Sequence, residues 1–281
     1  MKDRLQRTFR RWKKVRREKK RLFSVPTKCC HTDGLRHMSV SQLHDIFGSE
    51  QLEKEWINLE TNLKDICQIE GAKTGAVNAG DRRAIYYLIR SFRPQSVLEI
   101  GTYVGASTVH IAAALRSFHR EDPSIQANLT SIDIQDANDP TSGYWRQVGL
   151  AHSPQAMING LQCSQFVRFV KEDSLRFLGQ CDERYDFIFL DGDHSATTTY
   201  QEIPLALGVL DEEGVILLHD YYPNNRLLWS DANVIPGPFI AATRLRSEGA
   251  SFDVLPLGRL PWGTKLNSNV TSLALLSCSR R

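Results

Sequence analysis

The sequence predicts an α/β protein built on a doubly wound sheet of mostly parallel strands. Short apolar runs with β-branched residues alternate with helical patterns along most of the chain. Acidic or imidazole side chains directly follow several of these runs. Because the carboxyl ends of parallel strands meet at one edge of a sheet, these side chains are expected to share one crevice. The runs predicted as strands cover residues 97–100, 129–134, 166–171, 187–190, 215–218, 252–257 and 272–277.

The composition is that of a globular protein, with 41% hydrophobic and 24% charged residues in a chain of 281. No apolar run approaches the roughly 18–20 residues that span a bilayer, and no hydrophobic signal core follows the basic N-terminus. The six cysteines show no Cys-x-x-Cys metal spacing, which favours reduced thiols. We therefore expect a cytoplasmic location, with peripheral membrane attachment as the variant that the N-terminus suggests.

Positive charge is concentrated at the N-terminus. Residues 1–22 carry a balance of +10, whereas the rest of the chain carries −7. The acidic body argues against a broad nucleic-acid interface. Four apolar residues of the arm lie at helical spacing, namely Leu5, Phe9, Trp12 and Val15. The pattern predicts an amphipathic helix that binds an anionic membrane surface or an acidic partner; a transit peptide, an RNA-binding tail and a disordered arm are the alternatives.

Three segments precede the first predicted strand. Residues 1–38 are expected to form the basic arm and a flexible linker. Residues 39–47 and 49–69 read as helices that cover the sheet edge or the site. Residues 71–80 form a loop of small residues, and Asp81 is placed to cap the helix that follows.

The turn after the first strand combines an acid with two glycines, in the order Glu99-x-Gly101-x-x-x-Gly105. In a doubly wound sheet this turn borders the ligand crevice, and glycine lets the backbone approach the ligand closely. Dinucleotide-binding turns have the spacing Gly-x-Gly-x-x-Gly, which is lacking here, and the Glu99 carboxylate would repel a pyrophosphate. The pattern favours a cationic ligand, and a tight turn without a ligand is the alternative.

This pattern resembles motif I of the class I S-adenosylmethionine (SAM) methyltransferases. The resemblance implies that the glycines face the methionine part of SAM and that the strand acid accepts from its ammonium, usually through water. The cofactor residues that it implies are Glu99, Gly101, Thr102, Tyr103, Gly105 and Ser107. The loop over 71–80 is similar to the loop that closes over the cofactor in catechol-type O-methyltransferases.

The second and third predicted strands also end in polar residues. In the class I fold an acid after the second strand binds both ribose hydroxyls, because one carboxylate accepts two hydrogen bonds. Asp133, followed by Ile134, matches this position, with a turn cap as the alternative. Asp173 and Ser174 follow the third strand and resemble the groups that contact the adenine in this fold. The resemblance implies that both contact the cofactor; a helix cap is the alternative for Ser174.

The fourth and fifth predicted strands supply the densest group of reactive side chains. Asp191, Asp193 and His194 follow the fourth strand, and His219 and Asp220 follow the fifth. Packing alone does not explain five such side chains at neighbouring strand ends. The group predicts acid–base chemistry in a cleft.

About half of the chain, from the first to the fifth strand, resembles the macrocin-type sugar and polyketide O-methyltransferases, relatives of the catechol enzyme (methyltransferase domain family 24). In their metal-dependent members, acids at these strand ends bind Mg²⁺; the matching positions are Asp191, His219 and Asp220. The base is an Asp or His just beyond the first acid, which corresponds to Asp193 or His194. His219 departs from the acidic pattern, since imidazole suits Mn²⁺, Fe²⁺ or Zn²⁺ better than Mg²⁺.

The resemblance implies a seven-stranded Rossmann-like sheet with a C-terminal antiparallel hairpin. The apolar patterns before the first strand predict N-terminal helices and a lid loop over 39–93, and the resemblance implies a SAM-binding methyltransferase domain over 94–281. The loop over 258–269 would border the acceptor site.

The expected function is SAM-dependent methyl transfer to a hydroxyl of a small molecule of the sugar, polyketide or phenolic type, with or without Mg²⁺ or Mn²⁺. One alternative is a nucleic-acid or protein methyltransferase targeted by the basic arm. Another is a SAM-binding protein without catalysis, because a fold alone does not establish chemistry. A homo-oligomer is compatible with the sequence.

Overall fold

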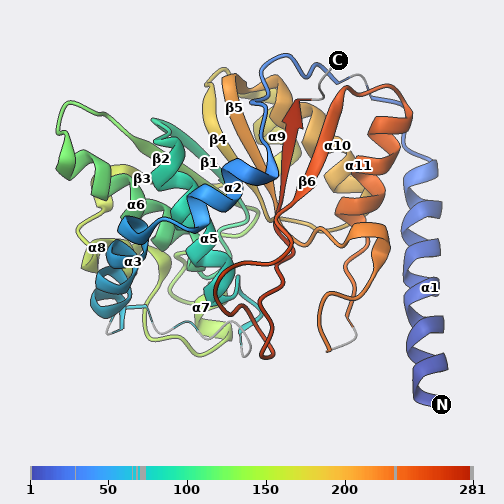
Figure 1. Cartoon of the computed structure of the whole chain (residues 1–281), viewed down its shortest axis with the longest axis horizontal. Helices are drawn as coiled ribbons and strands as arrows, with labels where there is room; N and C mark the ends of the chain where they lie inside the picture. The colour runs from blue at the N-terminus through green and yellow to red at the C-terminus, as the bar shows by residue number, and fades with distance from the viewer. Residues whose placement is uncertain are drawn as a thin grey trace.

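The computed structural model describes residues 2–28, 30–64, 66–67, 69, 74–230 and 233–278. A seven-stranded sheet forms its centre, in the order β3-β2-β1-β4-β5-β7-β6 (Figure 1). The first five strands along the chain are parallel, and β7 runs antiparallel between β5 and β6. The bounds are β1 Ser96–Ile100, β2 Asn128–Asp133, β3 Val167–Lys171, β4 Tyr185–Leu190, β5 Leu210–Leu218, β6 Phe252–Pro256 and β7 Ala274–Cys278. The predicted doubly wound sheet with a C-terminal antiparallel hairpin is confirmed.

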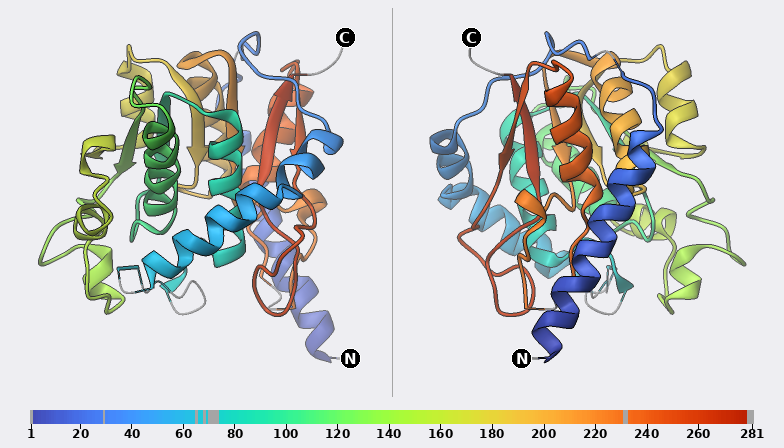
Figure 2. Two further views of the ribbon diagram at one scale, coloured as in Figure 1. Left: turned by 60° about the vertical axis from the view of Figure 1, so that its left-hand side comes forward. Right: turned by 90° about the vertical axis from the view of Figure 1, so that its right-hand side faces the viewer.

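Helices cover both faces of the sheet (Figure 2). Helices α2, α3, α5 and α6 pack on the face that carries Val97 and Phe187, and α9, α10 and α11 pack on the face that carries Leu98 and Ile188. Alternate residues of one strand thus enter two different cores, as expected for strands buried on both faces. The bounds are α1 Lys2–Phe23, α2 Val40–Phe47, α3 Glu50–Leu63, α5 Ala79–Phe92, α6 Ala106–Glu121, α7 Tyr144–Gln147, α8 Pro154–Gly160, α9 Ser174–Gln180, α10 Ala196–Gly208 and α11 Gly237–Ser247.

Several helix boundaries differ from the sequence prediction. The sequence after the first strand predicts a helix over 106–115, but α6 continues to Glu121 because Phe118 is fully buried in the core and extends the apolar face. The sequence also predicts one helix over 145–160. The structure divides this segment into α7 and α8, since Pro154 begins a new helix that the Ser153 side chain caps. Helix α3 ends at Leu63, and part of the predicted continuation to residue 69 lies outside the described residues.

The start of α5 corrects the prediction for Asp81. Asn78 is the capping residue, because its Oδ1 accepts the backbone N–H of Asp81 at 3.1 Å. The helix therefore begins at Ala79, and Asp81 lies fully buried in its first turn. Of the predicted loop, residues 71–73 lie outside the described residues.

The basic arm forms α1, whose second half packs on α10 and α11. The carboxylate of Glu18 accepts the backbone N–H of Ala196 at 3.0 Å, and Leu22 is buried in the core. This half of the arm is a docked helix rather than a flexible segment, because it closes the N-terminus of α10 and fills a hydrophobic site. The first half projects beyond the body (Figures 1 and 2). None of the described helices has the length and apolar content needed to cross a bilayer.

The strand order reverses between β1 and β4, which lie side by side at the centre. Ile100 pairs with Leu190 at the ends of these strands, and the next residues are Gly101 and Asp191. Gly101 has a φ of 99°, and a Cβ atom at this position would overlap the Asp191 carbonyl. Only glycine permits this conformation and this approach of the two chains.

We predict that Gly101→Ala lowers the free energy of unfolding by about 2–4 kcal/mol, because it adds backbone strain and a clash at once. Urea unfolding followed by circular dichroism measures the loss. Gly179→Ala is the matched control: Gly179 lies in α9 with no atom within 4 Å of an added Cβ. The control should retain or gain stability, and equal losses in both variants would contradict the argument.

Candidate active site

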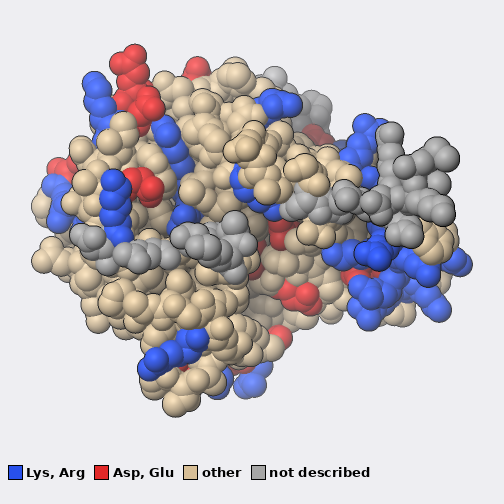
Figure 3. Space-filling view, turned by 90° about the horizontal axis from the view of Figure 1, so that it is seen from below, with Lys and Arg blue, Asp and Glu red and all other residues tan. Residues whose placement is uncertain are grey.

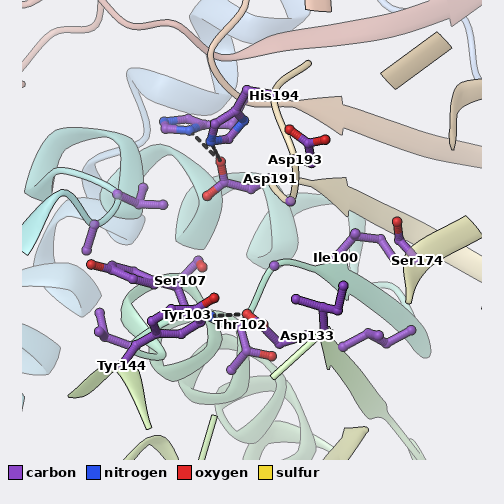
Figure 4. A pocket seen from close by; sticks show the side chains of 18 of the residues that line it. Ile100, Thr102, Tyr103, Ser107, Asp133, Tyr144, Ser174, Asp191, Asp193 and His194 are labelled. Atoms are coloured by element: carbon purple, nitrogen blue, oxygen red, sulfur yellow. Dashed lines mark hydrogen bonds and ion pairs between the residues drawn. The ribbon is translucent and has the colours of Figure 1, made fainter. Parts of the chain in front are cut away.

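A cavity of about 510 Å³ lies at the carboxyl ends of the parallel strands. This size is typical of small-molecule sites. Most of the predicted site residues line it: Gly101, Thr102, Tyr103, Ser107, Asp133, Ile134, Asp173, Ser174, Asp191, Asp193, His194, His219 and Asp220. Figure 4 shows Asp133 and Tyr103 toward one end of the cavity and Asp191 and His194 toward the other. The reversal of strand order thus joins two chemically different ends in one cavity.

At the first end, backbone contacts hold the Asp133 carboxylate. Its Oδ2 accepts the N–H of Tyr103 at 2.8 Å, and its Oδ1 accepts the N–H of Gln135 at 3.0 Å. The Tyr103 hydroxyl donates to the carbonyl of Thr74 at 2.7 Å, and its ring lies 4.9 Å from that of Tyr144. The carboxylate is therefore held in position before any ligand binds.

Glu99 lies behind the cavity wall and does not line it. Its Oε2 accepts from the hydroxyls of Thr108 and Ser131, each at 2.6 Å. Its Oε1 is buried and has no hydrogen-bond partner among the described residues. Burial raises the pKa of Glu99 to about 7, although these hydroxyl groups favour the ionised form. Because Glu99 lies behind the wall, its Oε1 atom could interact with a cationic ligand only through a group that lies between them.

Gly105 also lies outside the wall, which corrects the expectation that both glycines face the ligand. It precedes α6 with a φ of 79°, and a Cβ atom would lie 2.9 Å from the Cβ of Pro154. The glycine is required by the turn and by packing against α8.

Asp173 and Ser174, which follow β3, make contacts that differ from the predicted alternative in which Ser174 caps the next helix. Asp173, not Ser174, caps α9, since its Oδ1 accepts the N–H of Arg176 at 3.0 Å. The Ser174 hydroxyl donates to Glu202 Oε1 at 2.6 Å. Burial raises the pKa of Glu202 to about 7. The sequence did not indicate Glu202, because it lies in the middle of a helix and far from any strand end.

At the second end, three carboxylates surround His219. Its Nδ1 lies 2.7 Å from Asp191 Oδ1, its Nε2 lies 3.3 Å from Asp81 Oδ2, and Asp220 Oδ1 is 3.8 Å from Nδ1. Asp81 is a site residue that the sequence analysis missed. Asp81 was predicted as the helix cap because it lies where the helix was expected to begin. Only the recognition of Asn78 as the cap could have indicated another role for Asp81.

The predicted metal ligands meet as expected. One ligand atom from each of Asp191, His219 and Asp220 lies within 4.8 Å of the others. However, both ring nitrogens of His219 already face carboxylates, so neither offers a lone pair to a cation in this arrangement. Burial alone would lower the pKa of His219, but the charges of Asp191 and Asp220 raise it well above its usual value. As arranged, the donor set does not fit a divalent cation.

The two candidate bases have different surroundings. The Asp193 carboxylate accepts from the hydroxyls of Ser195 and Thr198 at 2.9 and 2.7 Å and from the Ser195 N–H. Burial would raise the pKa of Asp193, but these hydrogen bonds outweigh it and lower the pKa. His194 is partly exposed, and its Nε2 lies 3.5 Å from Asp220 Oδ2 and 4.0 Å from Asp191 Oδ1.

The loop over 71–80, which the resemblance places over the cofactor, contributes Gly75, Ala76 and Val77 to the cavity wall. Two other lining residues were absent from the prediction. Tyr144 and Thr198 also line the cavity. No strand end or motif marks these positions, because they reach the cavity only through the folding of the loops and helices around it.

Comparison with known proteins finds one family model and several solved structures that resemble this chain. The model of a family described as a methyltransferase domain matches residues 98–221. A search of curated protein sequences found no match. Among solved structures, the O-methyltransferase from Bacillus cereus in complex with SAH is 16% identical, with a TM-score of 0.54, over 78% of this chain and 91% of that one. The O-methyltransferase TomG from Streptomyces achromogenes, involved in tomaymycin synthesis and bound to SAM, is 16% identical, with a TM-score of 0.51, over 92% and 93%.

At this identity the solved structures establish the fold, and the family match adds the methyltransferase domain. The match spans β1 to the residues after β5, which are the elements that build the cavity. The family match indicates a methyltransferase domain over residues 98–221, and the sheet order agrees with the fold of these solved methyltransferases.

Proposed function

We propose that this protein transfers the methyl group of SAM to a hydroxyl group of a small molecule. The observation that carries the proposal is the pairing of two ends in one cavity: a backbone-held Asp133 at one end and an imidazole among carboxylates at the other. The first end suits a ribose and the second suits a hydroxyl that must lose a proton.

The chain offers a complete set of contacts for SAM. Asp133 would accept from the ribose hydroxyls, and Ile134, Asp173 and Ser174 would border the adenine. Gly101 lets the backbone approach the methionine part. The open Oε1 of Glu99 fits an ammonium reached through water or through the Ser107 hydroxyl. When bound, SAM supplies an electrophilic methyl group on a positively charged sulfur.

We assign the role of base to His194 rather than Asp193. Asp193 is occupied by hydrogen bonds at the start of α10, which weaken it as a base. His194 would take the hydroxyl proton on a ring nitrogen as the hydroxyl oxygen accepts the methyl group, which would leave the sulfur as a neutral thioether. Asp191 and Asp220 would orient the ring and the acceptor, and alignment of the reacting atoms would supply much of the rate.

The acceptor class rests on the chemistry of the second end. Aliphatic and phenolic hydroxyls need a base to remove their proton. The negative charges of Asp81, Asp191 and Asp220 would also repel an anionic acceptor. A neutral hydroxylated molecule of the sugar, polyketide or phenolic type fits these charges.

We predict that calorimetric titration at pH 7.5 detects binding of SAM but not of NAD. The affinity for SAM should fall by up to roughly tenfold for each pH unit below 7, because protonation of Glu99 removes the negative charge that favours an ammonium. In Glu99→Gln this pH dependence should be lost.

Glu202→Gln is the control for this experiment, because it neutralises a second buried glutamate whose pKa is also about 7. It should leave the pH dependence in place. Asp133→Asn should weaken SAM at all pH values. Preferential binding of NAD, or full SAM affinity in both Glu99→Gln and Asp133→Asn, would refute the cofactor site.

A second prediction separates the two candidate bases. With an acceptor found by screening hydroxylated small molecules, His194→Gln should lower kcat by about a hundredfold or more and leave SAM affinity unchanged. Asp193→Asn should lower the free energy of unfolding by about 1 kcal/mol through loss of hydrogen bonds at α10, with a smaller effect on kcat. The opposite ranking of kcat would make Asp193 the base.

We also predict that initial rates are unchanged after chelation with EDTA, because His219 already contacts carboxylates through both nitrogens. The measurement is the rate of methyl transfer before and after chelation, with Mg²⁺ or Mn²⁺ added back. A loss of activity that Mn²⁺ restores would instead assign Asp191, His219 and Asp220 to a metal centre.

A further inference from the structure

The projecting half of α1 exposes aromatic residues among positive charges. Phe9 and Trp12 are 54% and 51% exposed, and their rings stack with centroids 6.1 Å apart. Lys13 lies 4.5 Å from the Phe9 centroid, and Arg16 lies 5.2 Å from that of Trp12. Glu18 and Leu22 are the buried residues among those that the structure describes in α1, whereas these two rings are half exposed.

Two loops expose apolar side chains at the same edge of the molecule. The first follows β5 and carries Leu227, which is 43% exposed; the second follows β6 and carries Leu266, which is 53% exposed. Leu266 lies at the tip of a hairpin closed by the bridge between Arg259 and Val270. Because β5 and β6 both run antiparallel to β7, both loops leave the sheet at the edge where the cavity opens.

The projecting half of α1 extends on this side too, and a hydrogen bond from the middle of the helix links it to the first loop. Figure 1 shows the start of α1 and both loops at the lower side of the molecule. The Lys14 Nζ donates to the carbonyl of Val234 at 2.9 Å, which joins the helix to the segment after β5. We call the exposed residues Phe9, Trp12, Leu227 and Leu266, with the exposed Arg10, Lys13 and Arg16 of α1, the lower face.

Charge is divided on the lower face. Figure 3 shows a dense group of Lys and Arg at one side, where α1 lies, and acidic side chains in the central hollow. The arm over residues 1–22 carries +10, whereas the rest of the chain carries −7. An anionic partner is therefore attracted to one side of this face and not to the acidic body.

We propose that the lower face docks on an anionic lipid surface and turns the cavity mouth toward the headgroups. Lys and Arg of α1 contact the anionic headgroups, and the Phe9 and Trp12 rings enter the boundary between headgroups and acyl chains. Leu227 and Leu266 give two further apolar contacts away from α1. A nucleic acid or an acidic protein would satisfy the charge but would leave the apolar loop tips without a role.

Sedimentation of the full chain with lipid vesicles tests the proposal. At about 0.1 M salt, vesicles of phosphatidylcholine with about 30% phosphatidylglycerol should bind the protein, and pure phosphatidylcholine should not. The double variant Phe9→Ala/Trp12→Ala should bind the anionic vesicles at least tenfold more weakly, although it retains every positive charge. Leu266→Ser should weaken binding several-fold.

Two variants serve as matched controls. Phe23 is 89% exposed at the opposite end of α1, and Ile57 is 56% exposed on α3. Phe23→Ala and Ile57→Ser should bind as the unchanged protein does. Circular dichroism confirms that each variant keeps its helical content.

Three results would overturn the proposal. The first is an absence of binding to anionic vesicles, and the second is an equal loss in Phe23→Ala and in the double variant. The third is binding to RNA or to an acidic polypeptide that outcompetes the vesicles and is insensitive to the loss of Phe9 and Trp12. SAM titration of the vesicle-free protein is independent of all three, so failure here is distinguishable from failure of the proposed function.

Discussion

The parallel pairing of β1 with β4 is the constraint on which the site depends. The pairing aligns Ile100 with Leu190, and it brings Gly101 against the backbone of Asp191. On one side of this pair the chain continues to β2 and supplies Asp133; on the other it continues to β5 and supplies His219 and Asp220. The cofactor end and the chemical end of the cavity therefore meet across a single backbone contact that tolerates no side chain.

Electrostatic balance is the second condition of the site. Four acids, Asp81, Asp191, Asp220 and Asp193, gather at the chemical end, and like charges at such distances repel strongly in a poorly solvated cleft. His219 lies between three of them, and Ser195 and Thr198 stabilise the fourth. His194 also lines the cavity and is more exposed than Asp191 or Asp220.

The N-terminal helix connects the catalytic body with its surroundings. Its second half is part of the fold, since Glu18 contacts the N-terminus of α10, the helix that begins next to His194. Among the side chains that the structure describes in its first half, Phe9 and Trp12 are exposed aromatic rings. A helix that is anchored at one end and exposes aromatic rings toward the other suits a docking function.

The sequence by itself determined the sheet, the order of strands and helices, and the strand-end residues of the cavity. It could do so because burial on both faces gives continuous apolar runs, and because residues that follow parallel strands must share one edge. Boundaries that depend on packing were beyond it: α6 extends because Phe118 finds a core, and Gly105 faces Pro154 rather than the ligand.

Only the tertiary structure decided which side chains contact one another within the site. Asp81 and Glu202 lie on helices, where nothing in the local pattern distinguishes them from solvent-exposed acids, and long-range contacts with His219 and Ser174 make them part of the site. The choice between His194 and Asp193 likewise depends on which one the start of α10 occupies. Local periodicity specifies elements and edges, whereas the pairing of side chains from distant segments depends on how those elements pack.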